Sequence, residues 1–144
     1  MYEYACEIVR VVDGDTVDVD IDLGFGVWMK KQRIRLYGVD TPESRTRDLV
    51  EKKYGFAAKA FVKSYLPKGS PQTLKTKLDG KGKFGRILGE FIVEVFDHDM
   101  GAADTRETTI NKLLIENHHG VKYYGQSKED IAEEHIENRE LVNV

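Results

Sequence analysis

Residues 11–22 read Val-Val-Asp-Gly-Asp-Thr-Val-Asp-Val-Asp-Ile-Asp, and this stretch decides the class of fold. From Val17 to Asp22, apolar and acidic residues alternate with a period of two, which is typical of a strand with one buried face and one face in water. Asp13-Gly14-Asp15 is a turn signal between this run and the apolar run before it. The stretch therefore predicts a β-hairpin over residues 4–22.

The flanking sequence continues with further strands and helices. Gly24 and Gly26 mark a second turn, and Pro67 with Gly69 ends a segment whose apolar residues have helical spacing. In chain order the expected elements are a strand at 32–39, a helix at 53–66, strands near 72–78 and 86–96, a helix from a Thr108 or Thr109 cap to Gly120, and a helix near 128–139 capped by Ser127.

Five strands with a helix between the third and the fourth form the order of a five-stranded Greek-key barrel, the OB-fold. We therefore expect an α+β protein that is mainly a β-barrel, with about three helices, although the pattern alone leaves this as one candidate among several. A length of 144 residues suits a single core. Residues 1–144 are expected to form one domain, with 127–144 as its acidic C-terminal helix and tail.

Composition excludes several classes of protein. An aromatic content of 10% with only three prolines argues for a packed globule and against disorder. No stretch approaches the roughly 18 consecutive apolar residues of a membrane span, and the N-terminus lacks the pattern of a secretory signal. The lone Cys6 cannot form an internal disulfide. We expect a cytoplasmic protein that does not bind membranes, unless a leader was removed and the protein is secreted.

The net charge of −3 hides a strong asymmetry along the chain. Residues 1–28 carry a balance of −6, residues 29–86 a balance of +11, and residues 87–144 a balance of −8. A basic middle segment is expected of a protein that binds a phosphate-rich ligand. Charge alone leaves open that these lysines only solvate a helix and loops.

Three acidic residues fall in two short motifs. Asp15 lies in the first hairpin turn, and Asp40 and Glu43 flank a proline that stiffens the backbone. Carboxylates that converge repel one another unless a cation or proton relieves them, and oxygen ligands alone suit Ca²⁺ or Mg²⁺. Taken singly, the first motif also fits a simple tight turn, and the second fits a strand-to-helix connection.

The motifs are more specific together. Asp-Gly-Asp-Thr-Val at 13–17, Arg-x-x-x-Val-Asp-Thr-Pro-Glu at 35–43 and Lys-Phe-Gly-Arg at 83–86 resemble, in this order, the staphylococcal nuclease (thermonuclease) family. The resemblance extends from about Val11 to Tyr124 and includes the helix opening at 51–58. It implies an OB-barrel with three helices and Ca²⁺-dependent hydrolysis of phosphodiester bonds in DNA and RNA.

The resemblance also implies roles for individual residues. Phe84 stands where many relatives have a tyrosine, and the adjacent Tyr123 and Tyr124 stand where well-known members have a spaced pair, so the nucleotide pocket departs from the family pattern. The implied roles are metal carboxylates for Asp15 and Asp40, a backbone carbonyl ligand for Thr41, a general base for Glu43, binding of the scissile phosphate for Arg35 and Arg86, contact with a terminal phosphate for Lys83, and substrate binding for Phe84, Tyr123 and Tyr124.

The expected function is thus a nuclease of low sequence specificity that uses Ca²⁺, with Mg²⁺ or another divalent cation as alternatives. Its expected substrate is DNA, RNA or both, and it is expected to act as a monomer. The alternative from another class is a non-catalytic OB-fold module that binds nucleic acid or protein. A third hypothesis, compatible with catalysis, is that Phe25 and Trp28 at an apolar hairpin tip bind a partner protein.

Overall fold

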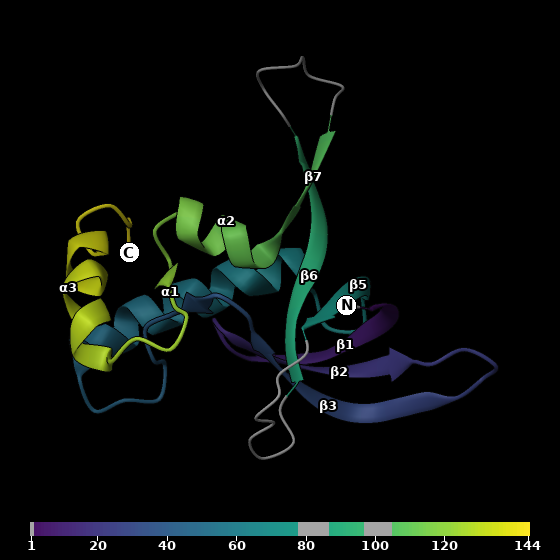
Figure 1. Ribbon diagram of the computed structural model, residues 1–144. Helices are drawn as coiled ribbons and strands as arrows, with labels where there is room; N and C mark the ends of the chain where they lie inside the picture. Colours follow the sequence, from purple (N-terminus) through teal and green to yellow (C-terminus); the bar gives the residue numbers. More distant parts are fainter. Residues whose placement is uncertain (1, 78–86, 97–104) are drawn as a thin grey trace.

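The computed structural model describes residues 2–77, 87–96 and 105–144. Within these residues, four strands come before the long helix, and two shorter helices follow later in the chain (Figure 1). The elements are β1 (Glu3–Asp13), β2 (Thr16–Asp22), β3 (Trp28–Leu36), β4 (Val39–Asp40), α1 (Leu49–Tyr65), β5 (Pro71–Lys77), β6 (Ile87–Phe96), β7 (Thr105–Thr109), α2 (Ile110–Glu116), β8 (Val121–Lys122) and α3 (Lys128–Asn138).

Five of the described strands close into a barrel. The sheet order is β3-β2-β1-β5-β6-β7, and β3 also pairs in parallel with β6, which joins the two ends of the five-stranded part. The closure places Ile34 opposite Ile87 and Leu36 opposite Gly89. The expected OB-fold barrel of α+β class is confirmed, because closing β3 on β6 leaves its apolar faces turned inward around one core.

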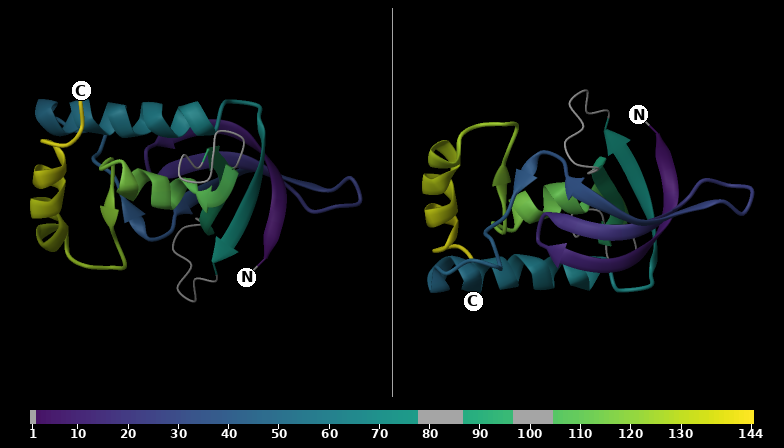
Figure 2. Two further views of the ribbon diagram at one scale, coloured as in Figure 1. Left: turned by 90° about the horizontal axis from the view of Figure 1, so that it is seen from above. Right: turned by 90° about the horizontal axis from the view of Figure 1, so that it is seen from below.

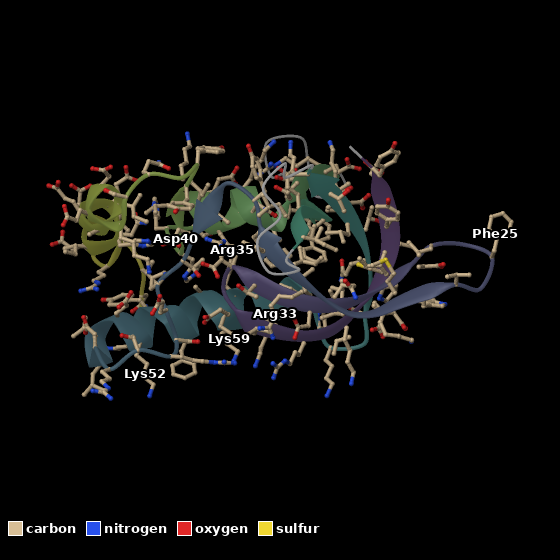
Figure 3. All side chains as sticks on the ribbon, turned by 60° about the horizontal axis from the view of Figure 1, so that its bottom comes forward. Phe25, Arg33, Arg35, Asp40, Lys52 and Lys59 are labelled. Carbon is tan, nitrogen blue, oxygen red and sulfur yellow. The ribbon has the colours of Figure 1, made fainter. Side chains whose placement is uncertain are left out.

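The first hairpin is confirmed with a two-residue turn. Asp13 pairs with Thr16, so only Gly14 and Asp15 connect β1 to β2. Along β2 the valines are fully buried and the intervening aspartates are only half-buried, which is the alternation that the sequence predicts. The hairpin tip between β2 and β3 extends away from the barrel, and Phe25 at its end is fully exposed (Figure 3).

The third strand differs from the expected 32–39. It begins at Trp28, because β2 and β3 stay paired almost to the tip, and it ends at Leu36. Gly38 adopts a positive φ of 77°, which interrupts the strand and separates the two-residue β4 from it. This break turns the chain so that Asp40 leaves the barrel wall.

The long helix begins four residues earlier than predicted. Asp48 caps α1 by accepting hydrogen bonds from the backbone N–H groups of Val50 and Glu51. Leu49 and Val50 are exposed, so the first turn carries no buried apolar periodicity that sequence analysis could detect. The buried face consists of Gly55, Ala58 and Val62, and Phe56 is half exposed instead of packed.

The C-terminal part contains two short pairings that were not predicted. β7 pairs antiparallel with β6, and β8 pairs with β4 in a separate two-stranded sheet. The predicted caps are confirmed at Thr109 for α2 and at Ser127 for α3, while α2 ends at Glu116, before the expected Gly120. α3 lies at the end of the molecule opposite the β2–β3 hairpin tip, crosswise to α1 (Figure 2).

Cys6 belongs to the barrel core, where burial raises the pKa of its thiol to about 12. A thiol in such a position packs as a small apolar side chain. Within the described residues, every helix is too short or too polar to cross a bilayer.

Candidate active site

Asp15, Arg35 and Asp40 converge where the first turn, the end of β3 and β4 meet. The Nη1 atom of Arg35 lies 3.6 Å from Oδ2 of Asp15, and its Nη2 atom lies 3.3 Å from Oδ1 of Asp40. Arg35 and Asp15 are each about 15% exposed, so this pairing takes place largely out of water. Figure 3 shows Arg35 and Asp40 side by side between the barrel and α3.

Arg35 is also bound to the backbone around the site. Its Nη1 donates to the carbonyl oxygens of Val39 at 2.8 Å and Leu36 at 3.1 Å. These bonds bridge the break in the strand, since the two carbonyls lie on either side of Gly38. The guanidinium group thus fixes the direction in which the chain leaves β3, besides balancing two carboxylates.

Asp15 is held in a polar environment that nevertheless disfavours its charge. Its carboxylate accepts hydrogen bonds from the Thr41 backbone N–H at 3.2 Å and the Thr16 hydroxyl at 3.1 Å. Burial raises the pKa of Asp15; Arg35 and the Thr41 N–H act against this rise, and the neighbouring Asp40 carboxylate adds to it. A buried carboxylate whose pKa is raised in this way is typical of a functional site.

Glu43 reaches the same site from the loop after β4. The next residue, Ser44, is buried and hydrogen bonded through its backbone N–H and its hydroxyl to the carboxylate of Asp13. The turn that carries Asp13 packs tightly, because a Cβ built on Gly14 would lie 2.8 Å from both Ala58 Cβ and Thr41 Oγ1. The first hairpin turn therefore anchors the Glu43 loop as well as presenting Asp15.

α3 brings two further side chains to these acids. Nε2 of His135 lies 2.9 Å from Oδ2 of Asp40, and Nζ of Lys128 lies 3.4 Å from Oε1 of Glu43. The first contact is largely buried, whereas Lys128 is 86% exposed and Glu43 55% exposed. An exposed ion pair of this kind contributes little, typically about 0–1 kcal/mol, so Glu43 is not locked away from solvent.

Together these residues line a cleft with a volume of about 770 Å³. Asp15 and Asp40, which are less exposed than Glu43, form the floor of the cleft, and α3 contributes basic and apolar side chains to the lining. The lining residues are Asp13, Asp15, Thr16, Arg35, Asp40, Thr41, Glu43, Arg45, Glu51, Tyr123, Lys128, Ile131, Ala132, His135, Ile136 and Arg139.

The structure brings together six of the ten residues singled out from the sequence. Tyr124 lies outside the cleft lining and packs edge-on against Tyr37, with ring centroids 5.8 Å apart. Lys83, Phe84 and Arg86 lie outside the described residues. The six that share the cleft are Asp15, Arg35, Asp40, Thr41, Glu43 and Tyr123.

Sequence analysis missed the contribution of α3. His135 lies four residues after Ile131, the buried residue of this helix, so the two side chains share its inward face. That spacing was the available signal, but nothing in the local sequence connects α3 to Asp40, which lies 95 residues earlier.

The donor set at the cleft floor fits a hard divalent cation. Asp15 and Asp40 are near enough to influence one another electrostatically, and a cation would relieve that repulsion. In the described part of the chain, the buried Thr41 hydroxyl oxygen has no hydrogen-bond partner. In residues 2–77, 87–96 and 105–144, no three His, Cys, Asp or Glu side chains are placed to hold a metal ion together, so a cation here would need other oxygen ligands besides the two aspartates.

The protein is thus an OB-fold barrel with a cleft lined by carboxylates and arginines at its edge. The profile of the family described as staphylococcal nuclease homologue matches residues 33–142, which is most of the chain. The chain therefore belongs to the staphylococcal nuclease family.

Individual relatives agree with this assignment. The chain is similar to the thermonuclease of Staphylococcus hyicus, with 35% identity over 60% of this chain and 47% of the relative, and to that of Staphylococcus intermedius, with 37% identity over 56% and 44%. It is 27% identical to endonuclease YhcR of Bacillus subtilis over 85% of this chain and 9% of that protein. The chain thus spans about half the length of the two thermonucleases it matches.

Proposed function

We propose that this protein is a metal-dependent nuclease that hydrolyses phosphodiester bonds of DNA, RNA or both with low sequence specificity, as a monomer. The single observation that carries the proposal is the convergence of Asp15, Arg35 and Asp40 at the floor of one cleft, with Glu43 on its wall. Membership of a family that includes thermonucleases supports the same activity.

The residues of the cleft match the requirements of the reaction. A phosphodiester is anionic and repels a nucleophile, so hydrolysis needs neutralised charge and a positioned water. Glu43, which is half exposed, accepts a proton from the attacking water. Arg35 holds the two aspartates. We propose that Arg35 also contacts the scissile phosphate and that Arg86 binds its remaining oxygens in a planar fork.

Asp15, Asp40 and the backbone carbonyl of Thr41 would hold the cation, for which we propose Ca²⁺. A divalent cation at such a site neutralises phosphate charge and supplies a Lewis acid. The proposed substrate contacts are Lys83 and Phe84, with Tyr123 on the cleft wall and Tyr124 beside it. A module that only binds nucleic acid gains nothing from a cluster of acids next to the phosphate, which disfavours the non-catalytic alternative.

The test is the Glu43→Gln variant, assayed on plasmid and single-stranded DNA with Ca²⁺, with Mg²⁺ and with chelator. We expect turnover to fall by about 10²–10⁴, the usual range for a general base, while affinity and folding stay near wild type. The isosteric change removes the proton acceptor and keeps the side-chain shape.

Two results would contradict the proposal. Undiminished cleavage by the wild type in excess chelator would remove the cation from the mechanism. Binding without cleavage by the wild type under all ionic conditions would favour the non-catalytic OB-fold module. Wild-type turnover in Glu43→Gln would leave a nuclease but make Glu43 a structural residue.

A further inference from the structure

Both carboxylate oxygens of Asp40 have partners on opposite sides. Arg35 Nη2 donates to Oδ1 at 3.3 Å, and the His135 ring lies 2.9 Å from Oδ2. Asp40 itself lies in the two-residue strand β4, which pairs with β8. With one contact from the barrel and one from α3, the plane of the carboxylate is fixed.

α3 is held in place by contacts that do not involve Asp40. Ile131 is 4% exposed, and Asn138 donates to the carbonyl oxygen of Gly120 at 3.3 Å. Tyr54 of α1 donates its hydroxyl to the carbonyl oxygen of Arg139 at 3.2 Å, and the Arg139 guanidinium lies over the Tyr54 ring. The position of the His135 ring is therefore set by the fold around it.

The surroundings of the ring decide which nitrogen donates. Nδ1 of His135 is buried and has no hydrogen-bond partner among the residues that the structure describes. A buried N–H without an acceptor is costly, whereas Nε2–H has a carboxylate acceptor at hand. In a neutral ring, this arrangement favours the tautomer with the proton on Nε2, donating to Asp40.

We infer that His135 is a positioning residue that orients Asp40 as a cation ligand, so that the C-terminal helix completes the active site. The inference rests on the proposed function, since Asp40 needs a fixed orientation only if it binds a cation. Hydrogen-bond partners of metal ligands set the direction and basicity of the ligand, and their loss typically weakens metal binding by about 10–100-fold.

The test compares His135→Leu, which removes the donor, with His135→Gln, whose side-chain amide can donate from a similar position. His119→Leu is the matched control, because His119 packs on Phe61 outside the cleft. Calcium affinity is measured by calorimetry without nucleic acid, and kcat and KM are measured on single-stranded DNA. Urea unfolding checks that each variant folds.

We expect His135→Leu to raise the Kd for Ca²⁺ by about 10–100-fold, with the loss of activity at subsaturating Ca²⁺ recovered by adding more cation. KM for DNA should change little, His135→Gln should recover most of the affinity, and His119→Leu should match the wild type. In metal-free wild type, long-range ¹H–¹⁵N NMR should show the Nε2–H tautomer of His135.

Failure of this inference differs from failure of the proposed function. A wild type that neither binds Ca²⁺ nor cleaves DNA overturns both. A wild type that does both, beside a folded His135→Leu variant of equal or tighter Ca²⁺ affinity, overturns the positioning role alone. If His135→Leu fails to fold, the test uses His135→Gln and the tautomer. A folded His135→Gln variant whose Ca²⁺ affinity stays far below that of the wild type, or an Nδ1–H tautomer in the wild type, overturns the positioning role alone.

Discussion

At the scale of single residues, Arg35 combines two tasks. The resemblance to nucleases assigns it to the phosphate, and the structure shows it also holding Asp15, Asp40 and two backbone carbonyls. A lysine keeps the charge but cannot make these bonds at once, because it lacks the planar fork. Arg35 is therefore needed for the shape of the site as well as for its charge.

We expect Arg35→Lys to lower turnover by orders of magnitude and to lower the free energy of unfolding by about 1–3 kcal/mol, the cost of leaving buried acceptors unsatisfied. DNA affinity should change modestly. Lys63→Ala, on the exposed face of α1, is the control and should leave saturated turnover unchanged. An Arg35→Lys variant with wild-type stability and rate would reduce Arg35 to part of the general basic surface.

The residues at the site were predictable to different degrees. The short motifs that carry Asp15, Asp40 and Glu43 were enough to predict an acidic site, and the structure brings all three residues to one cleft. The contacts of Arg35 with backbone carbonyls were not predictable, because they depend on the interruption of the strand at Gly38. The contact of His135 with Asp40 was not predictable either, since it joins residues far apart in sequence.

At the scale of elements, the sequence predicted those with a strong period or a clear cap. The β1–β2 hairpin and the caps Thr109 and Ser127 were predicted correctly. β4 and β8 were missed because two residues cannot show a period, and each is defined only by pairing with the other. The buried face of α1 was misjudged because its closest packing uses Gly55, which has no apolar side chain to mark it.

Gly55 determines how closely α1 approaches the Glu43 loop. A Cβ built there would lie 2.6 Å from the Ser44 backbone nitrogen and would also contact the Glu43 carbonyl group. That loop cannot easily move, since Ser44 is tied to Asp13. A glycine in the middle of a helix normally costs about 1 kcal/mol relative to alanine, and here it allows two backbones to touch.

We expect Gly55→Ala to lower the free energy of unfolding by about 1–3 kcal/mol, as overpacking does, despite the better helix propensity of alanine. The displaced loop should also lower kcat by carrying Glu43 away. Ser64→Ala, on the exposed face of the same helix, gains propensity without a clash and should change stability by no more than about 0.5 kcal/mol. Urea unfolding and kcat of both variants provide the measurement. A Gly55→Ala variant more stable than the wild type would contradict the close approach.

At the scale of the whole molecule, the structure refines the charge asymmetry of the sequence. Arg33 adds to the +11 balance of residues 29–86, but its Nε and Nη2 atoms lie 2.9 and 3.1 Å from the Asp18 carboxylate. Hydrogen bonds from Arg33 lower the pKa of Asp18, so this acid stays ionised and neutralises the charge of Arg33. On α1, Lys52 and Lys59 lie along one side of the molecule with Arg33 (Figure 3), and we propose that the lysines of this helix attract nucleic acid.

This distribution predicts how binding should depend on salt. With Ca²⁺ present and Glu43→Gln in the background to prevent cleavage, even six phosphate contacts would weaken DNA binding by about 10³ between 50 and 200 mM salt. Lys59→Ala should reduce the slope of log affinity against log salt by at most about 1 and the affinity by less than about tenfold. Arg33→Gln should change the slope less than Lys59→Ala, because Arg33 is held by Asp18, and Asp18 keeps Arg10 as a partner when Arg33 is removed. DNA binding that does not change with salt in the Glu43→Gln protein would mean that the basic segment does not face the substrate. An equal effect of Arg33→Gln and Lys59→Ala would mean that net charge attracts the polymer, and not the lysines of α1 in particular.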